Sequence, residues 1–197
     1  MPDDPELIRA AIAQRFARVA LTPEQETRFP VGLASARRLG YGVAELDAVP
    51  ATATESFCGV GYPFALGLPC PGETVLDLGC GAGLDCLVAA WYVGSTGRVI
   101  GVDRSPEMIA RACQTTQALG LKQVEVMQGE IERLQVADAS VDLVLSNGVF
   151  NLCLDKPAVL AEIVRVLRPG GRLQMADILV HEEVSPDTVA QRGAWSD

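Results

Sequence analysis

A glycine-rich turn carries the strongest chemical signal in this sequence of 197 residues. Gly79, Gly81 and Gly83 follow the apolar run 75–78 and precede the apolar-rich segment 84–93. Glycines are needed where a ligand touches backbone, because a Cβ atom would block that approach. The first amides of a helix lack partners and can bind an acidic group. The pattern therefore predicts a ligand-binding turn between a strand and a helix.

Two aspartates accompany the turn and indicate which ligand it binds. Asp77 stands just before it, and Asp103 ends the next β-branched run, 24 residues after Gly79 (103 minus 79). A carboxylate at the tip of the neighbouring strand can accept hydrogen bonds from both hydroxyls of a ribose. A dinucleotide-binding turn needs glycine or alanine where Leu84 stands, so the spacing favours a nucleoside cofactor without pyrophosphate. S-adenosylmethionine fits, with Asp77 holding its ammonium group directly or through water, and an NAD(P)-dependent reductase is the less favoured alternative.

The segments around the turn alternate between short β-branched runs and helical patterns. Strands are expected at 75–78, 98–102, 123–127, 141–146 and 172–180, and helices at 84–93, 106–119 and 156–167. Strands that alternate with helices form parallel sheets covered on both faces. We therefore expect an α/β fold with a doubly wound, mostly parallel, Rossmann-like sheet of about five strands. Its ligand should lie at the carboxyl ends of the first and fourth strands, where the strand order reverses.

The N-terminal part of the chain has a different texture. Apolar residues recur at helical spacing between Pro5 and Pro23, and a second helical stretch follows, so residues 1–50 are expected to form a helical cap over the cleft. Residues 51–72 are rich in Pro, Gly, Thr and aromatic side chains, which predicts an ordered loop or lid. Residues 73–197 are then the cofactor-binding core.

Composition and charge exclude several classes of protein. Lys and Arg number 16 against 25 Asp and Glu, and a net charge of -9 argues against nucleic-acid binding. No window approaches the roughly 20 apolar residues of a membrane span, and the acidic N-terminus lacks a secretory pattern, so a cytosolic location is expected. The six cysteines are expected to be free thiols, and a single histidine, His181, with no CxxC pair leaves no zinc site.

Five motifs in chain order resemble those of the class I S-adenosylmethionine-dependent methyltransferases. They read DLGCGAG (77–83), GVD (101–103), QGEIERL (128–134), VDLVLSN (141–147) and RVLRPGG (165–171). The resemblance implies that Asp103 binds the ribose, and that Glu130 and Ile131 meet the adenine ring. It also implies that Ser146 and Asn147 lie under the methionine moiety, beside the transferring methyl group. The remaining expected cofactor contacts are Asp77, Gly79, Cys80, Gly81 and Arg104.

A closer resemblance, to the arsenite methyltransferase branch, covers nearly the whole chain. It rests on FPVGLASARRLGY (29–41), ESFCGVGYPFALG (55–67), GLDCLVAAWYVGSTGRVIGVDRSPEMI (83–109) and SNGVFNL (146–152). In that branch, cysteines near the glycine turn, in the strand-four motif and in a C-terminal extension hold As(III) as a tris-thiolate. Thiolate sulfur suits this task because it binds soft ions strongly.

The cysteine pattern of this sequence departs from that branch. Gly148 stands where the strand-four motif has cysteine, and Val60 or Gly61 stands near the place of the loop cysteine. Cys58 and Cys153 lie close to these two places but are shifted along the chain. They are either displaced arsenic ligands or buried, inert thiols, and no other metal ligation is expected.

The resemblance predicts in-line methyl transfer to a small-molecule acceptor. The candidate catalytic residues are Asn147, Tyr62, Cys58 and Cys153, with Tyr62 in the lid that forms the acceptor wall. Alternatives are a quinone-like or thiol acceptor in place of arsenite, or a cofactor-binding protein or fragment without turnover. The family adds an antiparallel strand pair after the fifth strand, which this sequence lacks, and an uncovered fifth strand predicts a homodimer through that edge.

Overall fold

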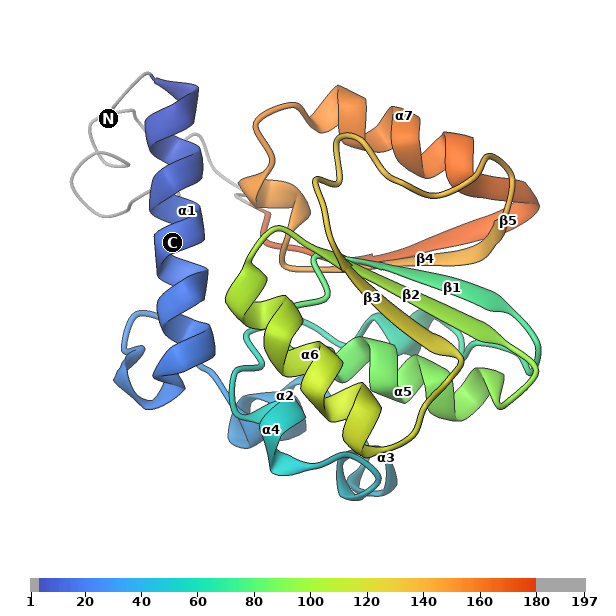
Figure 1. Ribbon diagram of the computed structural model, residues 1–197, viewed down its shortest axis with the longest axis horizontal. Coiled ribbons are helices and arrows are strands. Elements are labelled where there is room, and N and C mark those ends of the chain that lie inside the picture. Colours follow the sequence, from blue (N-terminus) through green and yellow to red (C-terminus); the bar gives the residue numbers. More distant parts are fainter. Residues whose placement is uncertain (1–3, 180–197) are drawn as a thin grey trace.

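The computed structural model describes residues 4–179 and contains a single five-stranded sheet in that range (Figure 1). The strand order is β3-β2-β1-β4-β5, and all four pairings are parallel. The strands are β1 Thr74–Leu78, β2 Arg98–Asp103, β3 Val124–Gln128, β4 Val141–Asn147 and β5 Leu167–Ala176. The expected doubly wound, Rossmann-like parallel sheet is confirmed, and its order reverses between β1 and β4.

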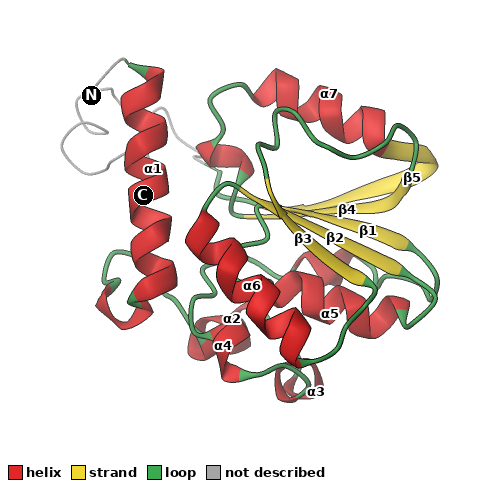
Figure 2. Cartoon of the chain, in the orientation of Figure 1, coloured by secondary structure: helices red, strands yellow, loops and turns green. Residues whose placement is uncertain are grey.

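Helices cover both faces of the sheet. Helices α5 (Leu84–Val93) and α6 (Pro106–Ala118) lie on one face, and α7 (Lys156–Val166) lies on the other (Figures 1 and 2). Neighbouring residues of β1 point to opposite faces: Val75 joins the apolar core under α5, and Leu76 joins the core under α7. Because both faces are covered, β1 is buried along nearly its whole length, which explains its continuous apolar run.

The N-terminal region is helical, as expected, but contains more elements than the sequence indicated. It holds α1 Pro5–Leu21, η1 Pro23–Gln25, α2 Leu33–Leu39, α3 Val43–Asp47, α4 Ala51–Thr54 and η2 Pro63–Leu66. Helix α4 and the η2 turn fall inside the segment 51–72 that was expected to be a loop. These short elements depend on tertiary contacts, such as the hydrogen bond between Thr52 Oγ1 and Thr115 Oγ1 at 3.0 Å. The periodicity of apolar residues in the sequence therefore does not predict them. No helix among the described residues is long and apolar enough to cross a membrane.

Strand β5 differs from its expected bounds at both ends. It begins at Leu167, where Leu167 pairs with Val141, and the register then shifts so that Arg172 pairs with Leu143. The Pro-Gly-Gly stretch therefore forms an irregularity within the strand, with Gly170 at φ +84°, and α7 ends one residue earlier than expected. The strand ends at Ala176 rather than at residue 180, which lies outside the described residues together with His181.

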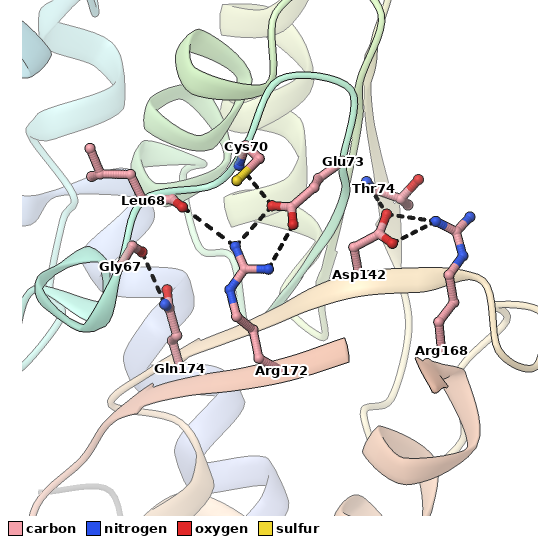
Figure 3. A network of polar contacts seen from close by, with 9 residues as sticks. All are labelled: Gly67, Leu68, Cys70, Glu73, Thr74, Asp142, Arg168, Arg172 and Gln174. Carbon is pink, nitrogen blue, oxygen red and sulfur yellow. Dashed lines mark hydrogen bonds and ion pairs between the residues drawn. The ribbon is translucent and has the colours of Figure 1, made fainter. Parts of the chain in front are cut away.

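Two arginines of β5 form ion pairs with carboxylates near the start of β1 (Figure 3). The guanidinium of Arg172 donates to both carboxylate oxygens of Glu73, at 2.7 and 2.8 Å. Next to it, Arg168 donates to both oxygens of Asp142, at 2.6 and 2.7 Å, and Asp142 also accepts from the Thr74 amide. Since β5 has one hydrogen-bonded neighbour among the described strands, these bidentate pairs stabilise the edge of the sheet.

We expect Glu73→Gln to lower the free energy of unfolding by about 1 kcal/mol at pH 7, because it removes a half-buried, bidentate charge pair. Bonds from Arg172 lower the pKa of Glu73, so its contribution is present above the carboxyl pKa of the unfolded chain and is lost as pH falls. The deficit of the variant should therefore shrink below about pH 4 in urea titrations.

The control is Glu125→Gln, which breaks the exposed Arg98–Glu125 pair and should cost less than about 0.5 kcal/mol. Equal losses in the two variants would contradict the assigned difference.

Candidate functional site

A cavity opens at the carboxyl ends of β1 and β4, the place the sequence predicted. Its wall includes Gly79 and Gly81 from the turn after β1, Asp103 from the end of β2, and Asn147 from the end of β4. Helix α1 stands at this end of the sheet (Figure 1) and contributes Ile12, Ala13 and Phe16 to the wall. One helix of the N-terminal region thus reaches the cavity, and the expected role of residues 1–50 as a cap over the cleft stays a prediction.

The glycines of the turn are required for two different reasons. Gly81 has φ +53°, a left-handed conformation that other residues adopt only with strain, and a Cβ there would meet nothing closer than Met108 Sδ at 3.9 Å. Gly79 is also left-handed, at φ +67°, but a Cβ on it would overlap Val149 Cγ2 at 2.3 Å. The first glycine therefore allows β1 and the β4 loop to approach each other, and the second leaves backbone open to the cavity.

Asp103 links β2 to the glycine turn. Its Oδ1 accepts from the Ser105 amide at 2.8 Å, and its Oδ2 accepts from the Gly81 amide at 2.9 Å. Burial raises the pKa of this carboxyl group, and the backbone hydrogen bonds oppose that shift. A carboxylate offers about four acceptor positions, so two remain for the hydroxyls of a ribose. Its predicted ribose contact is compatible with this geometry and stays a prediction.

Asp77 lies beneath the turn rather than in the wall of the cavity. Its side chain is buried, and Cys86 Sγ donates to its Oδ2 at 3.3 Å. Burial, followed by the nearby Asp85 carboxylate, raises the pKa of Asp77 well above its usual value. Cys80 does line the cavity, whereas Ser146 is buried in the sheet opposite Leu78 and does not. The predicted ligand contacts of Asp77 and Ser146 stay predictions.

The two residues expected around an adenine ring, Glu130 and Ile131, both line the cavity, and Gly129 lies beside them. Arg104, expected as a cofactor contact, lines it as well, and its Nη2 is 3.1 Å from Glu130 Oε1, so the guanidinium and the carboxylate pair with each other. Ile131 is buried and offers apolar surface. The adenine contacts of Glu130 and Ile131 stay predictions.

Asn147 connects the end of β4 to the loop before η2. Its Oδ1 accepts from the amides of Val60, at 2.9 Å, and Gly61, at 3.1 Å, and its Nδ2 lies 3.0 Å from the Gly61 carbonyl oxygen. The same Nδ2 lies 3.0 Å from Asp85 Oδ2 and 3.1 Å from the Tyr41 hydroxyl. One amide group therefore holds the loop 59–61, which we call the lid segment, against the cavity.

Sequence reasoning missed Asp85 and Tyr41. Asp85 is the second residue of α5, is buried and lines the cavity, and Tyr41 donates a hydrogen bond to its Oδ1. Burial raises the pKa of Asp85 to about 6, against the bonds from Tyr41 and Asn147, which lower it. An acidic residue two positions after Gly83 was the available signal for Asp85. No local pattern could indicate Tyr41, because it is 44 residues away from its partner.

Tyr62 lies behind the lid segment and not in the wall of the cavity. Its hydroxyl donates to Glu45 Oε1 at 2.6 Å, and its ring packs edge-on against Tyr41 with centroids 4.8 Å apart. Two other aromatic residues of the same region differ in position: Phe57 lines the cavity, and Phe64 is buried against Tyr62. The structure thus gives Tyr62 a supporting position, and its predicted catalytic role stays a prediction.

Cys58 and Cys153 both line the cavity but belong to different clusters. Cys58 packs in the apolar cluster of Phe16 and Met108, under α1, and Cys153 packs in the cluster under α7. Burial raises the pKa of each thiol to about 12, helped by Asp103 at Cys58 and by Glu132 at Cys153. The two thiols share no neighbour in these contacts. Residues 4–179 contain no group of three His, Cys, Asp or Glu side chains arranged to hold a metal ion.

Gly148 stands where the arsenite methyltransferase pattern has cysteine, and it lies next to Val60, one of the two residues near the place of the loop cysteine. A Cβ on Gly148 would lie 3.1 Å from Val60 Cγ1, and Gly148 has φ +73°. The lid segment and the loop after β4 therefore meet through a valine and a glycine.

The parallel sheet, the glycine turn and the position of the cavity define a methyltransferase fold. The family described as "Methyltransferase domain" matches residues 70–195. The chain therefore belongs to this methyltransferase family, which implies S-adenosylmethionine as the methyl donor.

Within the family the chain is arsenite methyltransferase-like. It is 41% identical to the arsenite methyltransferase of Halobacterium salinarum over 94% of this chain and 51% of the relative. It is also similar to the crystal structure of CrArsM, an arsenic (III) S-adenosylmethionine methyltransferase from Chlamydomonas reinhardtii. That match has a TM-score of 0.68 and 39% identity, over 76% of this chain and 52% of the other. A demethylmenaquinone methyltransferase of Oceanobacillus iheyensis is 35% identical over 63% of this chain and 50% of the relative. The chain thus spans about half the length of these relatives.

We expect Asn147→Ala to release the lid segment, because three of its hydrogen bonds to the backbone of Val60 and Gly61 are lost. The amides of these two residues should exchange with deuterium about tenfold faster or more, since each lost bond weakens local protection by about 1 kcal/mol.

The matched control is Gln174→Ala, which removes the bond from Gln174 Nε2 to the Gly67 carbonyl oxygen, seven residues or fewer along the same loop. Exchange at Val60 and Gly61 should stay unchanged in this control. Unchanged exchange in Asn147→Ala as well would contradict the role given to the amide.

Proposed function

We propose that the chain binds S-adenosylmethionine in this cavity and transfers its methyl group to a small-molecule acceptor. The charge of the cavity supports the proposal most directly. Asp85 is a buried carboxylate in its wall and Asp103 a half-buried one, and Arg104 is the one Lys or Arg among the described lining residues. Arg104 is already paired with Glu130. A cationic ligand is favoured at such a site, and an anionic pyrophosphate is disfavoured, because buried charge is costly without a counter-charge.

The residues of the chain have to bind and orient the reactants rather than activate them. When bound, S-adenosylmethionine supplies a sulfonium methyl group that is already activated. The open backbone at Gly81 and the carboxylate of Asp103 bind its nucleoside, and the lid segment with Phe57 keeps water away from the acceptor side. Alignment of two reactants at close distance supplies roughly 7–11 kcal/mol of the barrier in favourable cases.

Trivalent arsenic is the first candidate acceptor. The relatives named arsenite methyltransferases favour it, and three thiols, the soft ligands that arsenic prefers, line this cavity: Cys58, Cys80 and Cys153. A hydroxylated, quinol-type acceptor is the second candidate, because Asp85, Tyr41 and Asn147 form a polar cluster beside the lid segment. The similarity to a demethylmenaquinone methyltransferase favours the same candidate.

Three further expectations from the sequence stay predictions. A cytosolic location and a homodimer through the β5 edge are two of them, and β5 is indeed an outer strand of the described sheet. A cofactor-binding protein without turnover is the third, and it differs from the proposal in the methyl-transfer assay below.

Titration calorimetry with S-adenosylmethionine tests the donor. We expect Asp103→Ala to weaken binding about ten- to hundredfold, because hydrogen bonds to a charged group are lost. Asp138→Ala, at an exposed acid that pairs with Arg165, is the control and should bind as the unchanged chain does. NAD should give no binding heat. Equal affinity in Asp103→Ala and the unchanged chain would reject the ribose role.

Radiolabelled methyl transfer separates the acceptors. Arsenite with glutathione, dithiothreitol alone and 1,4-dihydroxynaphthalene serve as probes, and product should form with at least one of them. If thiols hold arsenic, Cys58→Ser and Cys153→Ser should lower transfer to arsenite about tenfold or more, since a hydroxyl is a poor ligand for a soft ion. Cys70→Ser is the matched control, because Cys70 is exposed and does not line the cavity. Binding without product for any probe would favour the protein without turnover.

A further inference from the structure

Asp85 occupies a position that the fold alone does not require. Its side chain is 6% exposed and lines the cavity from the first turn of α5. An exposed acid near a helix N-terminus stabilises the helix at little cost, but a buried one loses hydration. A carboxylate kept at this position is therefore best explained by a ligand that needs it.

The groups around Asp85 supply hydrogen bonds but no positive charge. Tyr41, before α3, and Asn147, on β4, donate to it. The other titratable groups that act on it or respond to it are Glu45 from α3 and Asp77 from β1, and both are acidic. Among the described residues that line the cavity, the one cation is Arg104, which pairs with Glu130. None of these described groups supplies a counter-charge to Asp85, so a cationic ligand in the cavity would provide one.

The two carboxylates of the wall face different parts of it. Asp103 is held by the amides of Gly81 and Ser105, on the side of β2. Asp85 is tied through Asn147 to the lid segment, on the side of β4. S-adenosylmethionine has an uncharged nucleoside at one end and carries its sulfonium, ammonium and carboxylate groups at the other, where the two cationic groups outnumber the one anionic group. Because Asp103 is assigned to the nucleoside, Asp85 is the other carboxylate of the wall that can face the charged end.

Resting on the proposed function, we propose that Asp85 is the carboxylate that faces the cationic methionyl end of S-adenosylmethionine and selects a positively charged donor. The sequence motifs assigned this end to Asp77, but Asp77 lies beneath the turn and outside the wall. Asp85 reaches the cavity itself. This assignment makes Asp85 a cofactor-binding residue, with a positioning effect on the lid segment through Asn147.

The ionisation of Asp85 gives the proposal a second readout. With its pKa raised to about 6 by burial, Asp85 is charged at neutral pH and becomes protonated as pH falls through that value. An α-amino group has a pKa of about 7.7–8.0, so the ligand stays cationic in this range. Affinity for S-adenosylmethionine should thus fall between pH 7 and pH 5. The Tyr41 hydrogen bond lowers the pKa of Asp85, so Tyr41→Phe should move the midpoint to higher pH.

The experiment compares three ligands by titration calorimetry at pH 7. S-adenosylmethionine carries both cationic groups, S-adenosylhomocysteine has lost the sulfonium charge, and 5′-methylthioadenosine lacks the whole charged end. We expect Asp85→Asn to weaken S-adenosylmethionine about ten- to hundredfold, and 5′-methylthioadenosine less than about threefold. S-adenosylhomocysteine should lose affinity to an intermediate or equal degree. Asp103→Ala, in contrast, should weaken all three ligands, because all contain the ribose.

Asp138→Asn is the control, since Asp138 is an exposed acid that pairs with Arg165 and does not line the cavity. It should leave the affinity for S-adenosylmethionine at pH 7 within about threefold and leave the pH midpoint unchanged, because the substituted group is far from the ligand contact. Glu45→Gln tests the ionisation of Asp85 separately: the charge of Glu45 raises the pKa of Asp85, so this variant should move the pH midpoint downward, opposite to Tyr41→Phe.

The outcomes separate the two proposals. If the unchanged chain fails to bind S-adenosylmethionine, the proposed function fails. If it binds but Asp85→Asn weakens 5′-methylthioadenosine as much as S-adenosylmethionine, only the assignment of Asp85 fails. Circular dichroism checks that the variant folds. If it does not fold, the pH dependence of the unchanged chain decides, and an affinity that is equal at pH 5 and pH 7 overturns the assignment.

Discussion

Buried negative charge at the carboxyl end of the sheet is the constraint on which the rest of the site depends. Three carboxyl groups lie there: Asp77 on β1, Asp85 on α5 and Asp103 on β2. Burial raises the pKa of each of them, and Asp85 and Asp103 also raise the pKa of Asp77. Backbone amides and hydroxyl, thiol and amide donors satisfy these groups within the protein. Such donors add no positive charge, so a cationic ligand would lower the cost of ionising these groups.

The same constraint explains how much of the site the sequence could predict. The glycine turn, Asp103 and the order of strands and helices follow from local patterns, and the structure confirms the fold they predict. Asp85, Tyr41 and Asn147 meet because of contacts that span 44 to 106 residues, as their hydrogen bonds show. No spacing rule reaches so far. Burial also cannot be read from a motif, which is why Asp77 was expected in the cavity and lies beneath it.

The bounds of β5 illustrate a second limit. A Pro-Gly-Gly stretch predicts a break between a helix and a strand, and α7 does end there. Pairing between β5 and β4 nevertheless begins before this stretch, where Leu167 pairs with Val141 at the start of β4. Tertiary pairing thus extended a strand across residues whose local preference is a turn. Tertiary contacts also explain the short helices α3 and α4, which form because the surrounding chain stabilises them.

Val60 and Gly148 meet where the lid segment contacts the loop after β4, and Gly148 stands where the arsenite methyltransferase pattern has cysteine. The donor side of the cavity keeps the glycine turn and Asp103, while the lid segment and the loop after β4 meet through small apolar groups. One fold can serve several reactions in this way, because the donor side and the acceptor side of the cavity are built from different loops.

Glu45 gives the N-terminal region a property that no single element has. One carboxyl group accepts from Tyr62 behind the lid segment, from Tyr92 on α5 and from the Gly42 amide at the start of α3. If any one of these elements opens, its hydrogen bond to Glu45 breaks, and the hydrogen bonds between Glu45 and the other elements are weakened. The lid segment, α3 and the end of α5 are therefore coupled as one cooperative unit of local unfolding, although they are distant in sequence.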